Sequence, residues 1–179
     1  MAKRKRQAPY VTYIAGAIVA GIAIGALKFA VDDFVGFSLI VIFSLIYGTA
    51  LFFMLHKMSG SGGSIWRTRM ATALAVIAIA SAVVSYYAFD YKYTEYQGIQ
   101  YFASQGEDTS GMYLSFEGYL ESRGSMESSV GYLLPILPVT GFGIFVLDAV
   151  EFIVLAYACL RGVRGVRRPS KYDWEGEDV

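Results

Sequence analysis

The sequence contains little of what most redox, metal and disulfide-rich proteins depend on. A single cysteine, Cys159, and a single histidine, His56, stand among 179 residues. One cysteine rules out an intrachain disulfide, and one histidine rules out bis-histidine ligation of haem within the chain. We interpret Cys159 as a small apolar helix residue. The sequence therefore predicts no metal and no cofactor.

Catalytic motifs are missing as well. The chain has no HExxH, no CxxC, no nucleophile elbow and no Rossmann fingerprint. Its glycine-rich stretch at 59–64 lacks the lysine spacing of a phosphate-binding P-loop. We interpret that stretch as a flexible linker. These absences predict a protein that is not an enzyme.

Charged residues are scarce, at 17%, whereas hydrophobic residues make up 55%. Four long apolar stretches cover about 10–31, 35–55, 70–89 and 133–160. Each is long enough to cross a bilayer, which takes about 20 apolar residues as helix. Pro135 and Pro138 should break the start of the last stretch, so we place its regular span at about 139–160. The predicted fold is a single all-α integral membrane domain, 1–179, with four transmembrane helices.

The few charges are strongly segregated. Twelve of the 15 lysines and arginines fall in three segments next to the spans: 3–6, 57–69 and 161–171. Positive charge near span ends marks the cytoplasmic side, so both termini are predicted to be cytoplasmic in a multi-pass protein of the cell (inner) membrane. A cleaved signal peptide is the competing interpretation of the first span. The basic segments suit anionic headgroups, and no nucleic-acid partner is expected.

The segments outside the predicted spans are an extracytoplasmic loop at 90–132 and a cytoplasmic tail at 161–179. The loop is rich in aromatic residues, which disordered linkers generally lack. We expect short helices near 94–102 and 112–121, with a pair of strands as the alternative. In the second helix, one face would dock on the membrane surface or a partner through Met112, Phe116, Tyr119 and Leu120.

Small residues recur at helical spacing in the first and third spans. Such stripes let two backbones approach closely, which drives helix association in lipid. Whether the partner helix lies in this chain or in another subunit stays open. The predicted packing residues are Ala17, Gly21, Gly25, Ala71, Ala75, Ala78 and Ala82.

Asp148 and Glu151 are the acidic residues clearly inside a span. Their three-residue spacing places them on one helix face. A charged side chain at the centre of a membrane helix costs about 2.5–3.5 kcal/mol on insertion scales. The pair is either a proton- or cation-binding site or a buried structural contact. Candidate contacts are Ser81, Thr49, Tyr47 or another subunit, and Lys28 is a candidate counter-ion for Asp148.

The function predicted from these features is that of a structural or accessory subunit of a larger membrane complex. It would pack through the small-residue faces and dock through the aromatic loop. The alternative is a small oligomeric transporter or channel, coupled to protons or cations, that uses Asp148 and Glu151. Expected partners are the lipid bilayer and other membrane subunits, with bound lipids left open.

Overall fold

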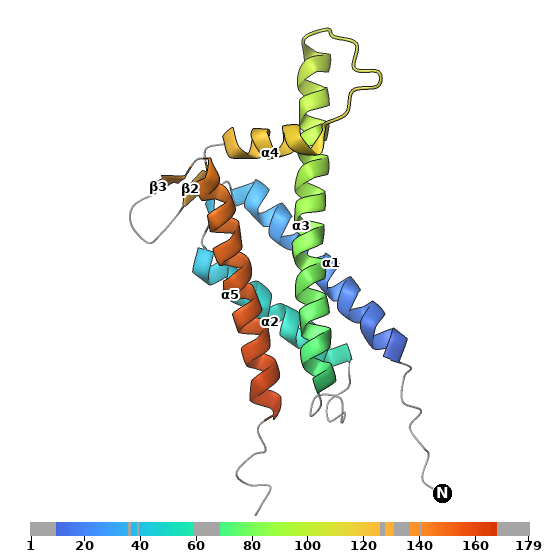
Figure 1. Cartoon of the computed structure of the whole chain (residues 1–179), viewed down its shortest axis with the longest axis vertical. Helices are drawn as coiled ribbons and strands as arrows, with labels where there is room; N and C mark the ends of the chain where they lie inside the picture. The colour runs from blue at the N-terminus through green and yellow to red at the C-terminus, as the bar shows by residue number, and fades with distance from the viewer. Residues whose placement is uncertain are drawn as a thin grey trace, which may run out of the picture.

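The computed structural model describes residues 10–35, 37–38, 40–58, 69–125, 128–130, 137–139 and 141–167. Within these ranges the chain forms helices, three very short strands and a connecting segment without regular structure at 105–115. The five helices are α1 (Tyr10–Val35), α2 (Ile40–Met58), α3 (Arg69–Ser104), α4 (Phe116–Ser125) and α5 (Phe142–Arg167). α1 begins and α5 ends at one end of the bundle, and α4 lies across the opposite end, called here the α4 end (Figure 1).

Three of the helices are long and apolar enough to cross a membrane: Tyr10–Phe34, Met70–Ser104 and Phe142–Arg164. α2 contributes a shorter apolar stretch, Ile42–Lys57. Large apolar side chains such as Val19, Val84 and Ile153 are exposed on these helices. Helices that are apolar on their outer as well as their inner faces are typical of membrane spans. The fold is therefore that of a helical membrane protein.

The bundle is built from two closely packed helix pairs, α1 with α3 and α2 with α5. A Cβ atom on Gly21 of α1 would lie 2.2 Å from the Ala78 carbonyl oxygen of α3. In the second pair, a Cβ on Gly48 of α2 would lie 2.3 Å from the Leu155 carbonyl oxygen of α5. Each pair therefore approaches at a glycine, because any side chain there would meet the neighbouring backbone.

α3 is much longer than the span predicted at 70–89. It contains 36 residues, which corresponds to about 54 Å of helix against about 30 Å of bilayer hydrocarbon. The segment 94–102, expected as a separate short helix in a loop at 90–132, continues α3 without a break. The prediction of a separate short helix at 94–102 is thus wrong. The helix projects beyond the rest of the bundle at the α4 end (Figure 1).

The chain returns from the tip of α3 to α4. Gly106 and Gly111 adopt positive φ values of 81° and 84°, which glycine tolerates best, in the connecting segment. α4 begins at Phe116, so Met112 lies outside the helix that was expected to start there. Its last turn is joined to the start of α5, because the Gly141 amide donates to the Gly124 carbonyl at 2.9 Å.

A small sheet lies beside α4 (Figure 1). β1 (Phe37–Ser38) pairs in parallel with β2 (Ser128–Val130), which pairs antiparallel with β3 (Leu137–Val139). Pro138 lies in β3 and α5 begins only at Phe142, so this proline precedes the helix rather than bending it. Pro135 lies outside the described residues.

Candidate functional site: a buried charge cluster

α5 carries two buried carboxylates near its start. Asp148 and Glu151 follow Phe142 by six and nine residues, which places them about 9 and 14 Å along the helix axis. Their side chains are only 7% and 4% exposed. Neither carboxylate can reach bulk water, so each needs a partner from within the protein.

Glu151 is paired with Lys28 of α1. The Lys28 ammonium donates to Glu151 and also to Asp32, one helical turn further along α1, at 2.5 Å. Lys28 is itself 2% exposed, and its ammonium lies 4.5 Å from the centre of the Tyr86 ring. The ammonium is therefore held by two carboxylates and one aromatic face, which offset its loss of water.

Asp148 is paired with Arg123 of α4. The Arg123 guanidinium donates to Asp148 at 2.7 Å and, through its other terminal nitrogen, to Asp90 of α3. The guanidinium thus joins α3, α4 and α5 at one point, a task that suits its planar fork of donors. Tyr119 donates its hydroxyl to the same Asp90, and burial raises the pKa of Tyr119, so this hydroxyl keeps its proton.

Two tyrosines of α3 lie between the ion pairs of Lys28 and those of Arg123, and they make contacts with both groups. Tyr87 donates its hydroxyl to Asp148 at 3.1 Å, and Tyr86 accepts a hydrogen bond from Arg123 at 3.2 Å. The Arg123 guanidinium lies about as far from the Tyr86 ring centre as from that of Tyr87, at 5.6 and 5.5 Å. Tyr86 therefore contacts both cations of the site.

We call this whole arrangement the charge cluster. Two cations face four carboxylates in it, so the cluster carries more formal negative than positive charge. Two nearby polar atoms are buried and have no hydrogen-bond partner among the described residues, the Arg123 Nε and the Tyr47 hydroxyl. The members of the charge cluster are Lys28, Asp32, Asp90, Arg123, Asp148 and Glu151.

The sequence singled out the two carboxylates of α5, and the structure pairs them differently from what was expected. Lys28, considered as the counter-ion of Asp148, instead binds Glu151. In the described part of the chain, the carboxylates bond to Lys28, Arg123 and Tyr87 rather than to Ser81, Thr49 or Tyr47. Arg123 was missed as a partner. The sequence feature that could have indicated it is the scarcity of cations in the predicted outer loop, which contains only Lys92 and Arg123.

The small residues of both predicted stripes lie where α1 and α3 meet. Ala17 on α1 and Ala71, Ala75, Ala78 and Ala82 on α3 are completely buried. A Cβ on Gly25 would approach the Ala82 carbonyl oxygen to 2.4 Å, just as that on Gly21 approaches Ala78. The two stripes face one another within this chain.

The four residues proposed for docking differ in their exposure. Tyr119 is buried against α3, whereas Met112, Phe116 and Leu120 are exposed. Tyr119 is withdrawn from the surface because its ring meets Tyr91 and its hydroxyl meets Asp90. The surface available for docking is therefore made by the other three residues and their neighbours.

No described group of three histidine, cysteine, aspartate or glutamate side chains is arranged to hold a metal ion. The chain matches no known family model, no curated protein and no solved structure. What the charge cluster does must therefore be inferred from its own geometry.

Proposed function

We propose that the chain is a four-span protein of the cell (inner) membrane, with α2 as the fourth span and both termini in the cytoplasm. The apolar stretch of α2 and its close packing on α5 support the fourth span. The cytoplasmic assignment comes from the basic segments beside the spans. It agrees with α1 beginning and α5 ending at the same end of the bundle (Figure 1).

This topology is tested by labelling single cysteines with a membrane-impermeant maleimide in intact cells, in a Cys159→Ser background. Ser104→Cys, at the end of α3, should be labelled from outside. Ser170→Cys, in the C-terminal segment, should be labelled only after the membrane is permeabilised. Labelling of both positions from the same side would overturn the proposal.

Within that topology, we propose a structural or accessory role in a larger membrane complex. The observation that carries this proposal is the projecting end of α3. It extends beyond α4 (Figure 1) and presents exposed aromatic side chains, namely Tyr96, Tyr101 and Phe102, with Tyr113 exposed in the connecting segment that follows. Exposed aromatic residues on a rigid support are typical of protein interfaces.

The charge cluster fits the same role. Both carboxylates of α5 are engaged by cations of this chain, and the ion pairs fix α4 and the base of the projection. Arg123 of α4 holds Asp90 of α3, and α3 projects beyond α4 (Figure 1). The cluster therefore orients the surface that a partner would meet.

A photo-crosslinking residue tests the accessory role. Placed at Tyr101 in native membranes, it should yield one discrete adduct with another membrane protein. The same residue at Ile153, an exposed position within a span, is the matched control and should give lipid adducts instead. A Tyr96→Glu change should weaken the Tyr101 adduct. Absence of any protein adduct at Tyr101 would contradict the accessory role.

One observation favours a second candidate, a proton-coupled transporter or channel. Four carboxylates share two cations in the charge cluster, so the cluster has capacity for an additional positive charge. In liposomes containing the purified chain, a proton flux should be measurable and should be lost on Asp148→Asn or Glu151→Gln. A flux that both variants leave unchanged would eliminate this candidate.

A further inference from the structure

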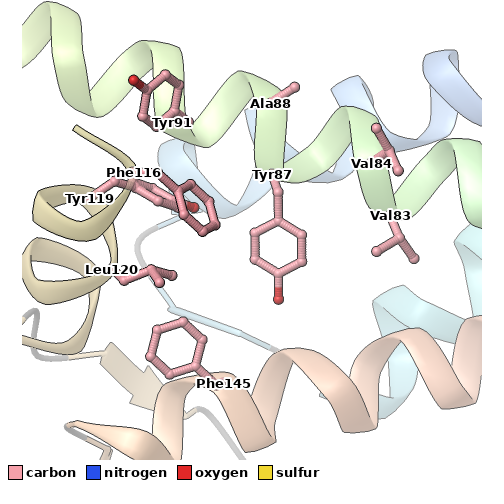
Figure 2. A pocket seen from close by; sticks show the side chains of 9 residues that line it. All are labelled: Val83, Val84, Tyr87, Ala88, Tyr91, Phe116, Tyr119, Leu120 and Phe145. Atoms are coloured by element: carbon pink, nitrogen blue, oxygen red, sulfur yellow. The ribbon is translucent and has the colours of Figure 1, made fainter. Parts of the chain in front are cut away.

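An apolar groove of about 520 Å³ lies between α3, α4 and α5. Val84 and Ala88 form one wall on α3, Phe145 forms the other on α5, and Phe116 and Leu120 of α4 close the end (Figure 2). The volume is within the range of about 300–1,000 Å³ that is usual for small-molecule sites. The lining is almost entirely apolar, so an occupant must be apolar along its length.

The groove is continuous with the surface that faces the bilayer. Its walls belong to α3 and α5, which are both candidate membrane spans. Val84 in the groove is 68% exposed, and Val146 beside Phe145 on α5 is exposed as well. Lipid chains that surround the spans therefore have direct access to the groove from the side.

α4 limits how far such an occupant can reach. Its side chains Phe116 and Leu120 point toward the groove between α3 and the first turns of α5 (Figure 2). From Val83 to Tyr91 the groove follows α3 for eight residues, or about 12 Å. Its shape suits one acyl chain that enters from the hydrocarbon and ends below α4, where the headgroup would lie.

The charges around α4 select among headgroups. Glu117 and Glu121 do not line the groove, but they are exposed on the face of α4 next to the one that carries Phe116 and Leu120, because successive helix residues are turned by about 100°. The cations described in this region are already paired, Arg123 with Asp90 and Asp148, and Lys92 with Glu95 at 2.6 Å. An anionic headgroup would meet repulsion here, whereas a headgroup that carries an ammonium would meet two carboxylates that have no ion-pair partner among the described residues.

We propose that the groove between α3, α4 and α5 binds one acyl chain of a phosphatidylethanolamine molecule, whose ammonium is held by Glu117 and Glu121. The proposal rests on the membrane topology proposed above, with the α4 end at one face of the bilayer. Tyr87 lines the groove (Figure 2). Its hydroxyl also donates to Asp148, so the bound chain contacts a residue of the charge cluster's hydrogen-bond network.

Native mass spectrometry of the full chain, released from nanodiscs of equal phosphatidylethanolamine and phosphatidylglycerol, tests the site. One retained phosphatidylethanolamine per chain is expected. Ala88→Trp fills the groove and should abolish retention. Val76→Trp, at an exposed position of α3 outside the groove, is the matched control and should retain the lipid. Equal retention by both variants, or a dimer mass without lipid, would overturn the proposal.

A surface variant tests the headgroup without disturbing the packing. Glu117→Lys with Glu121→Lys reverses two exposed charges and should shift preference toward phosphatidylglycerol, by roughly fivefold for each charge. An unchanged ratio of the two lipids would overturn the headgroup assignment. The maleimide labelling described above reads the topology separately, so a failure of lipid binding is distinguishable from a failure of the membrane topology.

Discussion

Two regions of the bundle hold its helices together by opposite means. Along the middle of α1, Gly21 and Gly25 bring the backbone onto α3 by having no side chain. One turn beyond Gly25, Lys28 reaches out from the same helix with a long charged side chain to Glu151 on α5. The first contact depends on shape over a short range, and the second depends on charge compensation in a medium of low dielectric constant. Disrupting the glycine contact should therefore destabilise the protein through steric overlap, whereas disrupting the ion pair should destabilise it by leaving a buried charge without a partner.

The largest expected effect is that of Arg123→Ala. It leaves the buried Asp148 and the partly buried Asp90 without their cation, and breaking a buried ion pair costs about 3–5 kcal/mol of unfolding free energy. Unfolding in mixed micelles, followed by circular dichroism, measures the loss. The triple variant that adds Asp90→Asn and Asp148→Asn should recover much of it. A loss that the added changes leave untouched would show that charge is not the cause.

Lys28→Met should cost less, near the lower end of about 3–5 kcal/mol, since Asp32 is 24% exposed and can be hydrated. The buried carboxylate that Lys28→Met leaves without a cation is that of Glu151. Lys28→Met combined with Glu151→Gln should be close to wild type in the same unfolding measurement. If the double variant is less stable than the single one, the ion pair is not the interaction that matters here.

Gly25→Leu tests the packed region. Its Cβ would lie 2.0 Å from the Ser85 hydroxyl oxygen and 2.4 Å from the Ala82 carbonyl oxygen, so α1 must move away from α3. Overpacking of this kind costs about 1–3 kcal/mol. Gly98→Leu is the matched control, because a Cβ there has no neighbour within 4 Å. Equal effects at the two glycines would mean that close approach of α1 and α3 is unimportant.

The smallest effect belongs to Lys92→Ala. Lys92 pairs with Glu95 at 2.6 Å, but it is 69% exposed, and exposed ion pairs contribute little to stability because water screens them. The unfolding free energy of the variant should therefore be close to that of the wild type in the same measurement. A larger loss of unfolding free energy would mean that the exposed Lys92–Glu95 pair stabilises the fold as the buried ion pairs of Lys28 and Arg123 do.

The sequence was most informative where one physical requirement dominates. Apolar length predicts the helices, and the spacing of Gly21, Gly25, Ala78 and Ala82 selects the residues that lie between α1 and α3. The partners of Asp148 and Glu151 could not be found in this way. Arg123 reaches Asp148 only because α4 folds back across α3 and α5, and this return depends on contacts far apart in sequence, such as Gly141 with Gly124.

The boundary of α3 was missed for a different reason. The apolar stretch ends near residue 89, and the polar, tyrosine-rich continuation carries no signal for a membrane helix. Helix geometry persists past that point because Thr94 and Lys92 are acceptable helix residues and the preceding turns are already formed. Hydropathy locates the edge of the hydrocarbon, and it does not locate the end of a helix.

The unbroken course of α3 makes it a lever. Arg123 grips the helix at Asp90, so the ion pair acts as a pivot between the arm embedded in lipid and the free arm above it. The arm from Asp90 to Ser104 is about 21 Å long, so a change in tilt of about 10° about this pivot moves its tip sideways by roughly 4 Å. A change in the tilt of α3 would thereby displace Tyr101, near the tip, more than Tyr96, which lies closer to the pivot.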